Sequence, residues 1–382
     1  MRVVVAIDSF KGSLTTLQAG NAVARGIKRV FDSAIVSVCP LADGGEGTLN
    51  ALLYEDETDL QKVKVCNPLG QRINTHYGII DDGGTAVIEI AAAAGITLIK
   101  EEEKNPMNTT TYGVGELIKD AVAKGCRNFI IGIGGSATND CGIGMLQALG
   151  FDFLDADGKP VEFGAKGLYN IKSISIKNTL PELAVCSFHV ACDVKNVLCG
   201  AQGCSAVYGA QKGATLHMIR QMDNWLRKFA VLTRSILKTD YSNYPGSGAA
   251  GGLGFAFLTY LNATLEPGID LIIRETHLED YIRNADIVIT GEGRLDGQTC
   301  MGKAPAGVAA IAKKYNVPVI AFSGCVADGA RQCNENGIDA FFPILRNPGT
   351  FEEAMEVKNA CQNMSDTVEQ VFKLIKSVSK NE

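Results

Sequence analysis

The two ends of the chain share the feature that most restricts its fold: short, continuously apolar segments alternate with segments of helical periodicity. Residues 3–7 predict a buried strand, because a run rich in β-branched residues and bounded by polar ones is typical of a parallel strand covered on both faces. Residues 16–30 predict a helix, since their apolar side chains recur on one face at helical spacing. The same patterns predict further strands at 34–38, 287–290, 317–323 and 340–344 and further helices at 305–315, 330–336 and 351–378. This alternation predicts a three-layer α/β domain with a parallel sheet.

The middle of the chain follows a different pattern. Strands predicted at 61–65, 73–80 and 85–90 are separated by turn signals, which favour hairpins and a mixed sheet. Further strands are predicted at 128–133, 151–154 and 185–191, and an apolar helix at 255–261. We therefore expect an α/β protein of two domains, a three-layer Rossmann-like parallel-sheet domain formed by both chain ends with a second mixed α/β domain inserted. The expected bounds are 1–60 plus 281–382 for the first domain and 61–280 for the inserted one, with the active site in the cleft between them.

Charge and composition exclude several classes of function. Lys and Arg number 36 against 42 Asp and Glu, a net charge of −6 with no concentrated basic run, so we expect no nucleic-acid partner. The longest apolar stretch, 86–99, contains Glu89 and is shorter than the ~20 residues of a membrane span, so we expect no membrane partner. The 12 cysteines form no C-x-x-C pair and only 4 histidines are present, which favours reduced thiols over disulfides or a zinc site. We expect a cytoplasmic protein, a monomer or a homodimer.

Five segments combine glycine with acids, hydroxyls or lysine near the ends of predicted strands. Glycine lets backbone N–H groups approach a ligand closely, and a following helix N-terminus carries partial positive charge. One such segment is more often an ordinary tight turn, but five in one chain favour a ligand site. In the first, 8–13, Asp8 can hold Mg²⁺ or orient a hydroxyl and Lys11 can hold phosphate, at the strand end where open α/β sheets bind ligands. The alternative is that Ser9 or Ser13 caps the helix and Lys11 is solvated.

The second and fourth segments offer acids or bare backbone to a ligand. In 43–48, two acids on a glycine scaffold suit a metal or substrate hydroxyls better than phosphate. The candidate residues there are Asp43, Gly44, Gly45 and Glu46. In 247–254, the N–H groups of Gly251 and Gly252 can cradle a carboxylate or phosphate without any side chain. The alternative for 247–254 is close helix packing through small residues.

The third segment, 132–140, supports an alternative function. It opens with G-x-G-x-x-A after a predicted strand, and Asp155 lies about 20 residues further on, as in the fingerprint of a nicotinamide-dependent hydroxy-acid dehydrogenase. Two features oppose this function: the expected helix is polar and broken by glycine, and Asp140 would stand near a pyrophosphate. The candidate ligand residues of this segment are Gly134, Gly135, Ser136, Asn139 and Asp140.

The fifth segment, 291–305, is the most suggestive by its chemistry. It contains G-x-x-x-x-G-K, followed by Ala304 where a P-loop needs Ser or Thr to bind Mg²⁺. Lys303 lies just before a predicted helix, a position that favours an anion. Glu292 and Asp296 can supply carboxylates for Mg²⁺ in place of the missing hydroxyl.

Asp193 is a further candidate, because it follows a predicted strand. A carboxylate there can act as a base, and the alternative is an exposed turn aspartate. Together the candidates indicate an enzyme that binds a phosphorylated ligand with Mg²⁺. Phosphoryl transfer needs positive groups and metal on the γ-phosphate and one carboxylate to accept the proton of the acceptor hydroxyl. A third function, a catalytically silent nucleotide-binding regulator, would need fewer acids and lysines than these segments supply.

These segments also resemble the motifs of type 1 glycerate kinases. The matching residues are 8–14, 40–48, 134–140, 247–254 and 291–308, in the family's order along essentially the whole chain. The resemblance implies a two-domain α/β kinase that uses ATP and Mg²⁺ to phosphorylate D-glycerate. It favours 2-phosphoglycerate as the product and a place in organic acid and glyoxylate catabolism. The expected partners are the small molecules D-glycerate and ATP.

The motifs and the resemblance together suggest roles for the charged candidates. We expect Lys303 and Lys11 to neutralise phosphoryl oxygens. Glu292 and Asp296 are expected to hold Mg²⁺.

The acceptor side of the reaction involves the other candidates. Asp193, or failing that Asp8, is the expected base toward the glycerate hydroxyl. The glycine turns at 134–135 and 251–252 are expected to bind phosphate or the glycerate carboxylate. The remaining candidate ligand residues are Ser9, Asp43, Gly44, Gly45, Glu46, Ser136, Asn139, Asp140, Gly291, Gly293 and Arg294.

The chain departs from the family pattern after Asp193. Val197 and Ala210 stand where the family has prolines, whereas Gln211 and Lys212 match. Because proline fixes φ, its loss at these two positions is expected to loosen this loop.

Overall fold

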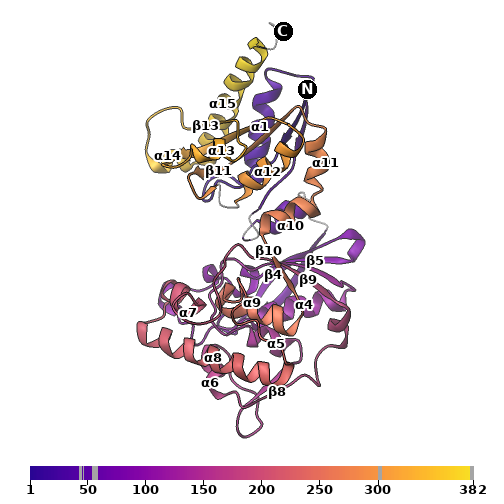
Figure 1. The fold of residues 1–382 in the computed structure, drawn as a ribbon, viewed down its shortest axis with the longest axis vertical. Helices are drawn as coiled ribbons and strands as arrows, with labels where there is room; N and C mark the ends of the chain where they lie inside the picture. The colour runs from indigo at the N-terminus through magenta and orange to yellow at the C-terminus, as the bar shows by residue number, and fades with distance from the viewer. Residues whose placement is uncertain (43–44, 46, 54–58, 300–302, 379–382) are drawn as a thin grey trace. The chain divides into compact units, whose positions relative to one another are not determined.

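The computed structural model describes residues 1–42, 45, 47–53, 59–299 and 303–378. The chain divides into two compact units, each built around its own main sheet (Figure 1). The first unit comprises Met1–Asp43, Asn50–Tyr54 and Ile269–Glu382, and the second comprises Gly44–Leu49 and Glu55–Gly268. Both ends of the chain therefore belong to the same unit.

The first unit contains a five-stranded sheet in which all neighbouring strands are parallel. The order is β13-β12-β11-β1-β2, with β1 at Arg2–Val5, β2 at Ile35–Val38, β11 at Ile287–Leu295, β12 at Val319–Val326 and β13 at Ala340–Pro343. Helices α1 (Thr16–Lys28) and α15 (Val357–Val378) pack on the face that carries Val3 and Val5. Val4 lies on the opposite face and is buried too, and α12 (Ala304–Lys314) contacts β11 and β12. The predicted three-layer α/β domain is confirmed.

A glycine allows the close contact between α1 and α15. A Cβ atom at Gly26 would lie 2.5 Å from the carbonyl oxygen of Ser365, so only glycine permits this approach. The Ser365 hydroxyl donates a hydrogen bond of 2.8 Å to the carbonyl oxygen of Ala22. At the start of α1, Thr15 and Gln18 form a capping box in which each side chain accepts the other's backbone N–H. The close approach at Gly26 and the Ser365 hydrogen bond hold the N-terminal and C-terminal parts of the chain together.

The second unit contains a six-stranded sheet of order β10-β9-β6-β5-β4-β3. The strands are β3 (Leu60–Cys66), β4 (Arg72–Ile80), β5 (Thr85–Glu89), β6 (Asn128–Gly132), β9 (Ser187–Ala191) and β10 (Thr264–Glu266). β4 is antiparallel to both β3 and β5, and the other pairs are parallel, which confirms the predicted hairpins and mixed sheet. The helices that contribute most to its core are α4 (Tyr112–Ala123), α5 (Ile143–Ala148), α8 (Leu216–Leu237) and α9 (Ala249–Tyr260).

The remaining described elements are shorter. A two-stranded sheet pairs β7 (Asp152–Leu154) with β8 (Ser173–Ser175). The other α-helices are α2 (Thr48–Leu53), α3 (Ala91–Ala94), α6 (Ala165–Asn170), α7 (Cys204–Tyr208), α10 (Gly268–Glu275), α11 (Leu278–Arg283), α13 (Gln332–Glu335) and α14 (Phe351–Met355). Short 3₁₀ segments lie at Asp81–Gly83, Ile96–Leu98, Glu101–Glu103, Pro181–Val185 and Ala210–Lys212. Within the described ranges, no helix combines the length and the apolar character that crossing a membrane requires.

Three predicted elements differ from the structure. The helix predicted at 351–378 is two helices, because Glu356 between them has the extended conformation φ −61°, ψ 123°. β9 begins at Ser187, since Pro181–Val185 forms a 3₁₀ helix. β11 does not end at residue 290 but continues to Leu295, because it pairs with β12 along this whole stretch. Residues 291–295, predicted as part of a glycine-rich turn, are therefore strand.

Candidate active site

In the first unit, the first and fifth glycine-rich segments lie together. The backbone N–H of Asp8 donates to the carbonyl oxygen of Gly291 at 2.9 Å, beyond the carboxyl end of β1. A Cβ atom at Gly293 would lie 3.4 Å from the Cα atom of Phe10, so the two segments are in van der Waals contact. Asp8 is 8% exposed, and its carboxylate accepts the backbone N–H of Ser9 at 2.7 Å. The parallel sheet thus joins two segments that are distant in the sequence.

Glu292 and Lys303 form an ion pair at the start of α12. The Nζ atom of Lys303 lies 3.1 Å from Oε2 of Glu292, and the hydroxyl of Thr299 donates to Oε1 at 2.6 Å. Glu292 belongs to β11 and is 8% exposed, whereas the Lys303 side chain is 41% exposed. Lys303 precedes the first residue of α12, as predicted, with Pro305 in the first turn. A lysine, a buried carboxylate and a helix N-terminus are thus brought to one place.

Asp296 holds the turn that follows β11. Its Oδ1 atom accepts the backbone N–H of Gln298 at 2.9 Å, and its own N–H donates to the hydroxyl of Thr299 at 3.1 Å. Its Oδ2 atom lies 3.5 Å from Nε of Arg294, whose side chain is 68% exposed. Across the described ranges, no three His, Cys, Asp or Glu side chains gather as a complete metal cage. Mg²⁺ in kinases is usually held by one or two carboxylates and by phosphate oxygens, so the chemistry of Glu292 fits this ion.

In the second unit, the other three glycine-rich segments meet in the loop that follows β6. A Cβ atom at Gly134 would lie 3.0 Å from the Cα atom of Gly45, which brings the second and third segments into contact. A Cβ atom at Gly251 would lie 2.1 Å from the carbonyl oxygen of Thr138, and one at Gly252 would lie 3.0 Å from the Cα atom of Cys141. Gly251 and Gly252 therefore pack against the third segment. Their predicted role in binding an anion stays a prediction.

The second segment is only partly described. Asp43, Gly44 and Glu46 lie outside the described residues. The adjoining Gly47 and Leu49 donate their backbone N–H groups to Oε1 of Glu89 at 3.0 and 2.9 Å. Glu89 ends β5, so a strand of the main sheet holds the start of α2. In the sequence, Glu89 is visible only as an interruption of an apolar stretch.

Asp140 is fully buried and anchors the loop after β6. Its carboxylate accepts the N–H and the hydroxyl of Thr111, each at 2.9 Å, and the N–H groups of Gly142 and Gly144 at 3.1 and 3.3 Å. Burial raises the pKa of Asp140, and the four hydrogen bonds oppose that rise. Because every one of these partners donates, the arrangement suits the ionised carboxylate, and Asp140 fastens the loop to the start of α4.

Lys212 also belongs to this site, although it was not among the candidates predicted from the sequence. It is 2% exposed, and its Nζ atom donates to the hydroxyl oxygen of Ser136 at 2.8 Å and to the carbonyl oxygen of Thr138 at 2.6 Å. Burial lowers the pKa of Lys212 to about 8. The match of Gln211 and Lys212 to the family pattern was the one signal for it, since no spacing in the chain relates Lys212 to Ser136.

Two neutral polar side chains complete the loop after β6. Asn139 is fully buried and donates from Nδ2 to the hydroxyl of Ser205 at 2.8 Å. Among the described residues, neither Oδ1 of Asn139 nor Oγ1 of Thr138 has a hydrogen-bond partner, although both are buried. Buried polar atoms without partners are uncommon in folded proteins, and a water or a ligand can satisfy them.

Asp193 lies after β9, as predicted, and is exposed. Its Oδ1 atom accepts the backbone N–H of Gly268 at 2.9 Å, at the start of α10. On the neighbouring strands, His189 and Glu266 are 2.8 Å apart (Nδ1 to Oε1). The Asp193 residue is therefore held at the start of α10 and is exposed to solvent.

The structure does not support the dinucleotide fingerprint that stood as an alternative at 132–140. In that motif the helix begins directly after the glycines. Here residues 133–142 are irregular, and α5 begins only at Ile143, after Gly142 with φ +71°. The loop is packed around the buried Asp140 carboxylate. Nothing in this site supports the nicotinamide-dependent dehydrogenase.

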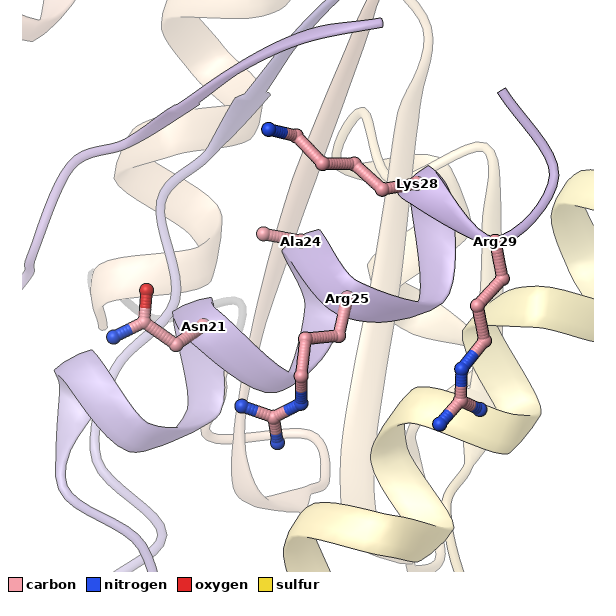
Figure 2. Close-up of a pocket in the computed structure, with 5 residues that line it drawn as sticks. All are labelled: Asn21, Ala24, Arg25, Lys28 and Arg29. Atoms are coloured by element: carbon pink, nitrogen blue, oxygen red, sulfur yellow. The ribbon is translucent and has the colours of Figure 1, made fainter. Parts of the chain in front are cut away.

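A surface hollow on α1 lies apart from the predicted site residues. It is lined by Asn21, Ala24, Arg25, Lys28 and Arg29 (Figure 2). Arg29 extends toward α15, where it pairs with Asp366 at 2.9 Å and Glu369 at 3.2 Å, and these partners raise its pKa. Arg29 therefore joins helices, and this hollow contributes nothing to the site.

Comparison with known proteins identifies the family of the chain. The sequence matches the model of the glycerate kinase family over residues 3–376. It is 45% identical to a glycerate kinase of Haemophilus influenzae over 98% of this chain and 99% of that protein, and 44% identical to the glycerate 2-kinase of Escherichia coli over 93% of each. A crystal structure of a Salmonella typhimurium LT2 protein assigned as glycerate kinase 2 superposes with a TM-score of 0.90 and 42% identity, over 100% of this chain and 99% of that one. The chain therefore belongs to the glycerate kinase family.

Proposed function

We propose that this protein transfers the γ-phosphoryl group of ATP, with Mg²⁺, to a hydroxyl group of D-glycerate, with 2-phosphoglycerate as the product. Its proposed place is organic acid and glyoxylate catabolism in the cytoplasm. The family membership supports the kinase, and the E. coli relative, whose name gives the 2-position, supports the product.

The observation that carries this proposal is the group formed by β11, the start of α12 and the segment that follows β1. Lys303 and the N-terminus of α12 offer positive charge to a phosphate, and the buried Glu292 carboxylate lies 3.1 Å from that lysine. Lys11 follows β1 in the segment that contacts Gly293. Phosphoryl transfer depends mostly on positioning and charge stabilisation, which this group can supply.

Mg²⁺ would be held by Glu292, with Asp296 as a second carboxylate. A carboxylate has about four lone-pair sites, so Glu292 can bind the ion while it still accepts from Thr299 and Lys303. When bound, the ion would supply positive charge that offsets the negative charge of the phosphate groups. Arg294, Gly291 and Gly293 surround these carboxylates in the sequence and remain proposed ligand residues.

The acceptor glycerate would use the second unit. Asp193 is the proposed base, with Asp8 as the alternative, because Asp193 is open to solvent and Asp8 is nearly buried. Ser136 and the N–H groups of Gly134 and Gly135 would bind an anionic group. The other proposed ligand residues are Ser9, Asp43, Gly44, Gly45, Glu46, Asn139, Asp140, Gly251 and Gly252.

A coupled assay of ADP release with D-glycerate, ATP and Mg²⁺ tests the proposal. Release should require all three components, and phosphorus NMR of the product should show the phosphate on the 2-hydroxyl. A 3-phosphoglycerate product would contradict the regiochemistry alone. No turnover by folded protein would contradict the substrate, and other hydroxy acids would then be tested as acceptors.

A further inference from the structure

We propose that Lys212 is a positioning residue that fixes the Ser136 hydroxyl as a hydrogen-bond donor to an oxyanion of the substrates, either the glycerate carboxylate or a phosphate oxygen of ATP. This inference rests on the proposed function. It proposes a role for a buried cation that is not part of the group formed by β11, the start of α12 and the segment that follows β1.

The direction of the hydrogen bond carries the argument. An ammonium group only donates, so at 2.8 Å the Ser136 oxygen must accept from Nζ of Lys212. A serine hydroxyl has one proton, and Ser136 is therefore left to donate that proton elsewhere. A donor bonded to a cation is also strengthened by the nearby charge. Ser136 retains 8% exposure, whereas Lys212 has 2%, so Ser136 is the member of the pair that a ligand can reach.

The backbone on both sides of Ser136 is fixed. Ile96 donates its N–H to the carbonyl oxygen of Gly135 at 2.8 Å, and Ala137 donates its N–H to that of Ala94 at 2.8 Å. These two bonds form an antiparallel bridge between Ser136 and Gly95. The hydroxyl therefore projects from a rigid frame, which is what precise recognition of an anion needs.

The charge of Lys212 is not balanced by a direct partner. Both of its acceptors, the Ser136 hydroxyl and the Thr138 carbonyl, are neutral, and among the described residues no carboxylate lies within ion-pair distance of Nζ. The charged or titratable groups that face it are Asp140 and Cys204, and the Asp140 carboxylate is already engaged by four donors. A buried cation without a partner is costly unless an anion arrives to compensate it.

The same loop contains a second sign of a ligand. The Thr138 hydroxyl and the Asn139 carbonyl oxygen are buried without partners among the described residues. Both lie within three residues after Ser136 in the chain, and Lys212 donates to the carbonyl oxygen of Thr138 between them. Polar atoms left without partners in a protein interior are usually satisfied by a ligand or an ordered water.

Steady-state kinetics of three variants test the inference. Lys212→Met removes the charge, Lys212→Arg keeps it, and Ser136→Ala removes the donor. We expect Lys212→Met and Ser136→Ala each to raise the KM of one substrate roughly 10- to 100-fold, as for a lost hydrogen bond to a charged group. The double variant should be no worse than either single variant, because both remove the same interaction. Lys177→Met, at an exposed lysine of the same unit, is the control and should change neither KM.

The substrate whose KM rises shows which oxyanion binds to Ser136. A rise in the KM of D-glycerate assigns the carboxylate, and a rise in the KM of ATP assigns the phosphate. Effects of Lys212→Met and Ser136→Ala that simply multiply, or KM values that stay unchanged, would overturn the inference. If Lys212→Met does not fold, the inference is tested with Ser136→Ala and Lys212→Arg instead.

The pH dependence separates a charged lysine from a structural one. Since the pKa of Lys212 is about 8, the wild-type KM for that substrate should rise above this pH as the ammonium loses its proton. Lys212→Arg should abolish the rise, because a guanidinium keeps its charge there. Identical profiles for the wild type and Lys212→Arg would contradict a role for the charge.

A wrong proposed function can be distinguished from a wrong role for Lys212, because the oxyanion site can be tested without turnover. If the wild type releases no ADP with D-glycerate, titration calorimetry with inorganic phosphate replaces kinetics. Weaker phosphate binding by both Lys212→Met and Ser136→Ala than by Lys177→Met would retain the oxyanion site. Equal binding by all proteins would overturn it.

Discussion

At the scale of single residues, the ion pair of Lys303 and Glu292 sets the charge at the start of α12. Lys303 is the N-cap residue of α12, and Glu292 belongs to a strand. The Thr299 hydroxyl donates to the same carboxylate and restricts its orientation. The pair brings together opposite charges for two different tasks, a cation for phosphate and a carboxylate for Mg²⁺. Substitution of Lys303 and substitution of Glu292 should therefore have different effects.

Lys303→Ala should lower kcat by about 10²- to 10³-fold, because one positive group is lost from the developing charge of the transferring phosphoryl group. The ADP-release assay measures this, and circular dichroism checks the fold. Lys314→Ala is a matched control on the same helix, since Lys314 is 61% exposed and pairs only weakly with Glu279 at 3.7 Å. An unchanged kcat for Lys303→Ala would remove this lysine from the mechanism.

Glu292→Gln should raise the Mg²⁺ concentration for half-maximal activity roughly tenfold or more. The amide oxygen can still accept from Thr299 or Lys303, so the change removes charge with little loss of packing. Chelation of Mg²⁺ should abolish ADP release by the wild type, and added Mg²⁺ should restore it. A Mg²⁺ dependence equal to that of the wild type would contradict the role of Glu292.

At the scale of elements, the strand ends and the loop after β6 decide where the site residues lie. Strands 3–7 and 128–133 could be predicted because continuous apolar runs are local signals. The extension of β11 through residues 291–295 could not, since glycine and charged residues are poor strand formers and only pairing with β12 makes this stretch a strand. The positions of Glu292 and Arg294 on a strand thus depend on a neighbour distant in the sequence.

Gly251→Ala should lower the free energy of unfolding more than Gly158→Ala does. Both glycines are left-handed, at φ +70° and φ +76°, which costs other residues about 1–2 kcal/mol. At Gly251 the new Cβ would also meet the Thr138 carbonyl oxygen at 2.1 Å, whereas at Gly158 nothing lies within 4 Å. Overpacking adds about 1–3 kcal/mol. Urea unfolding measures the difference, and equal losses would contradict the close contact of these two segments.

At the scale of the whole molecule, the first unit depends on both ends of the chain. α1 and α15 pack on one face of its sheet, and Gly26 allows their contact. The assignment of both chain ends to one α/β domain followed from the repeated alternation of strands and helices. The predicted active site in a cleft between domains and the predicted monomer or homodimer stay predictions.

Val368→Ala tests the packing of α15 against α1. Val368 is fully buried, and truncation of a buried valine should lower the free energy of unfolding by about 1–3 kcal/mol. Leu374→Ala is the matched control on the same helix, because Leu374 is 62% exposed, and should change it by less than about 0.5 kcal/mol. Chemical unfolding of both variants is the measurement. Equal losses of unfolding free energy in the two variants would contradict the packing of Val368 in the core between α15 and α1.

The sequence by itself determined the alternation of strands and helices, the places of the five glycine-rich segments and the family, because these are properties of consecutive residues. Tertiary structure alone decided which segments meet. Lys212 and Ser136 are 76 positions apart, and the contact of Asp8 with Gly291 joins residues still further apart in the chain. No local pattern encodes such contacts, since they exist only when the packing of two sheets and their helices closes loops between distant residues. The charge on a buried lysine and the direction of its hydrogen bonds therefore became visible only in the folded protein.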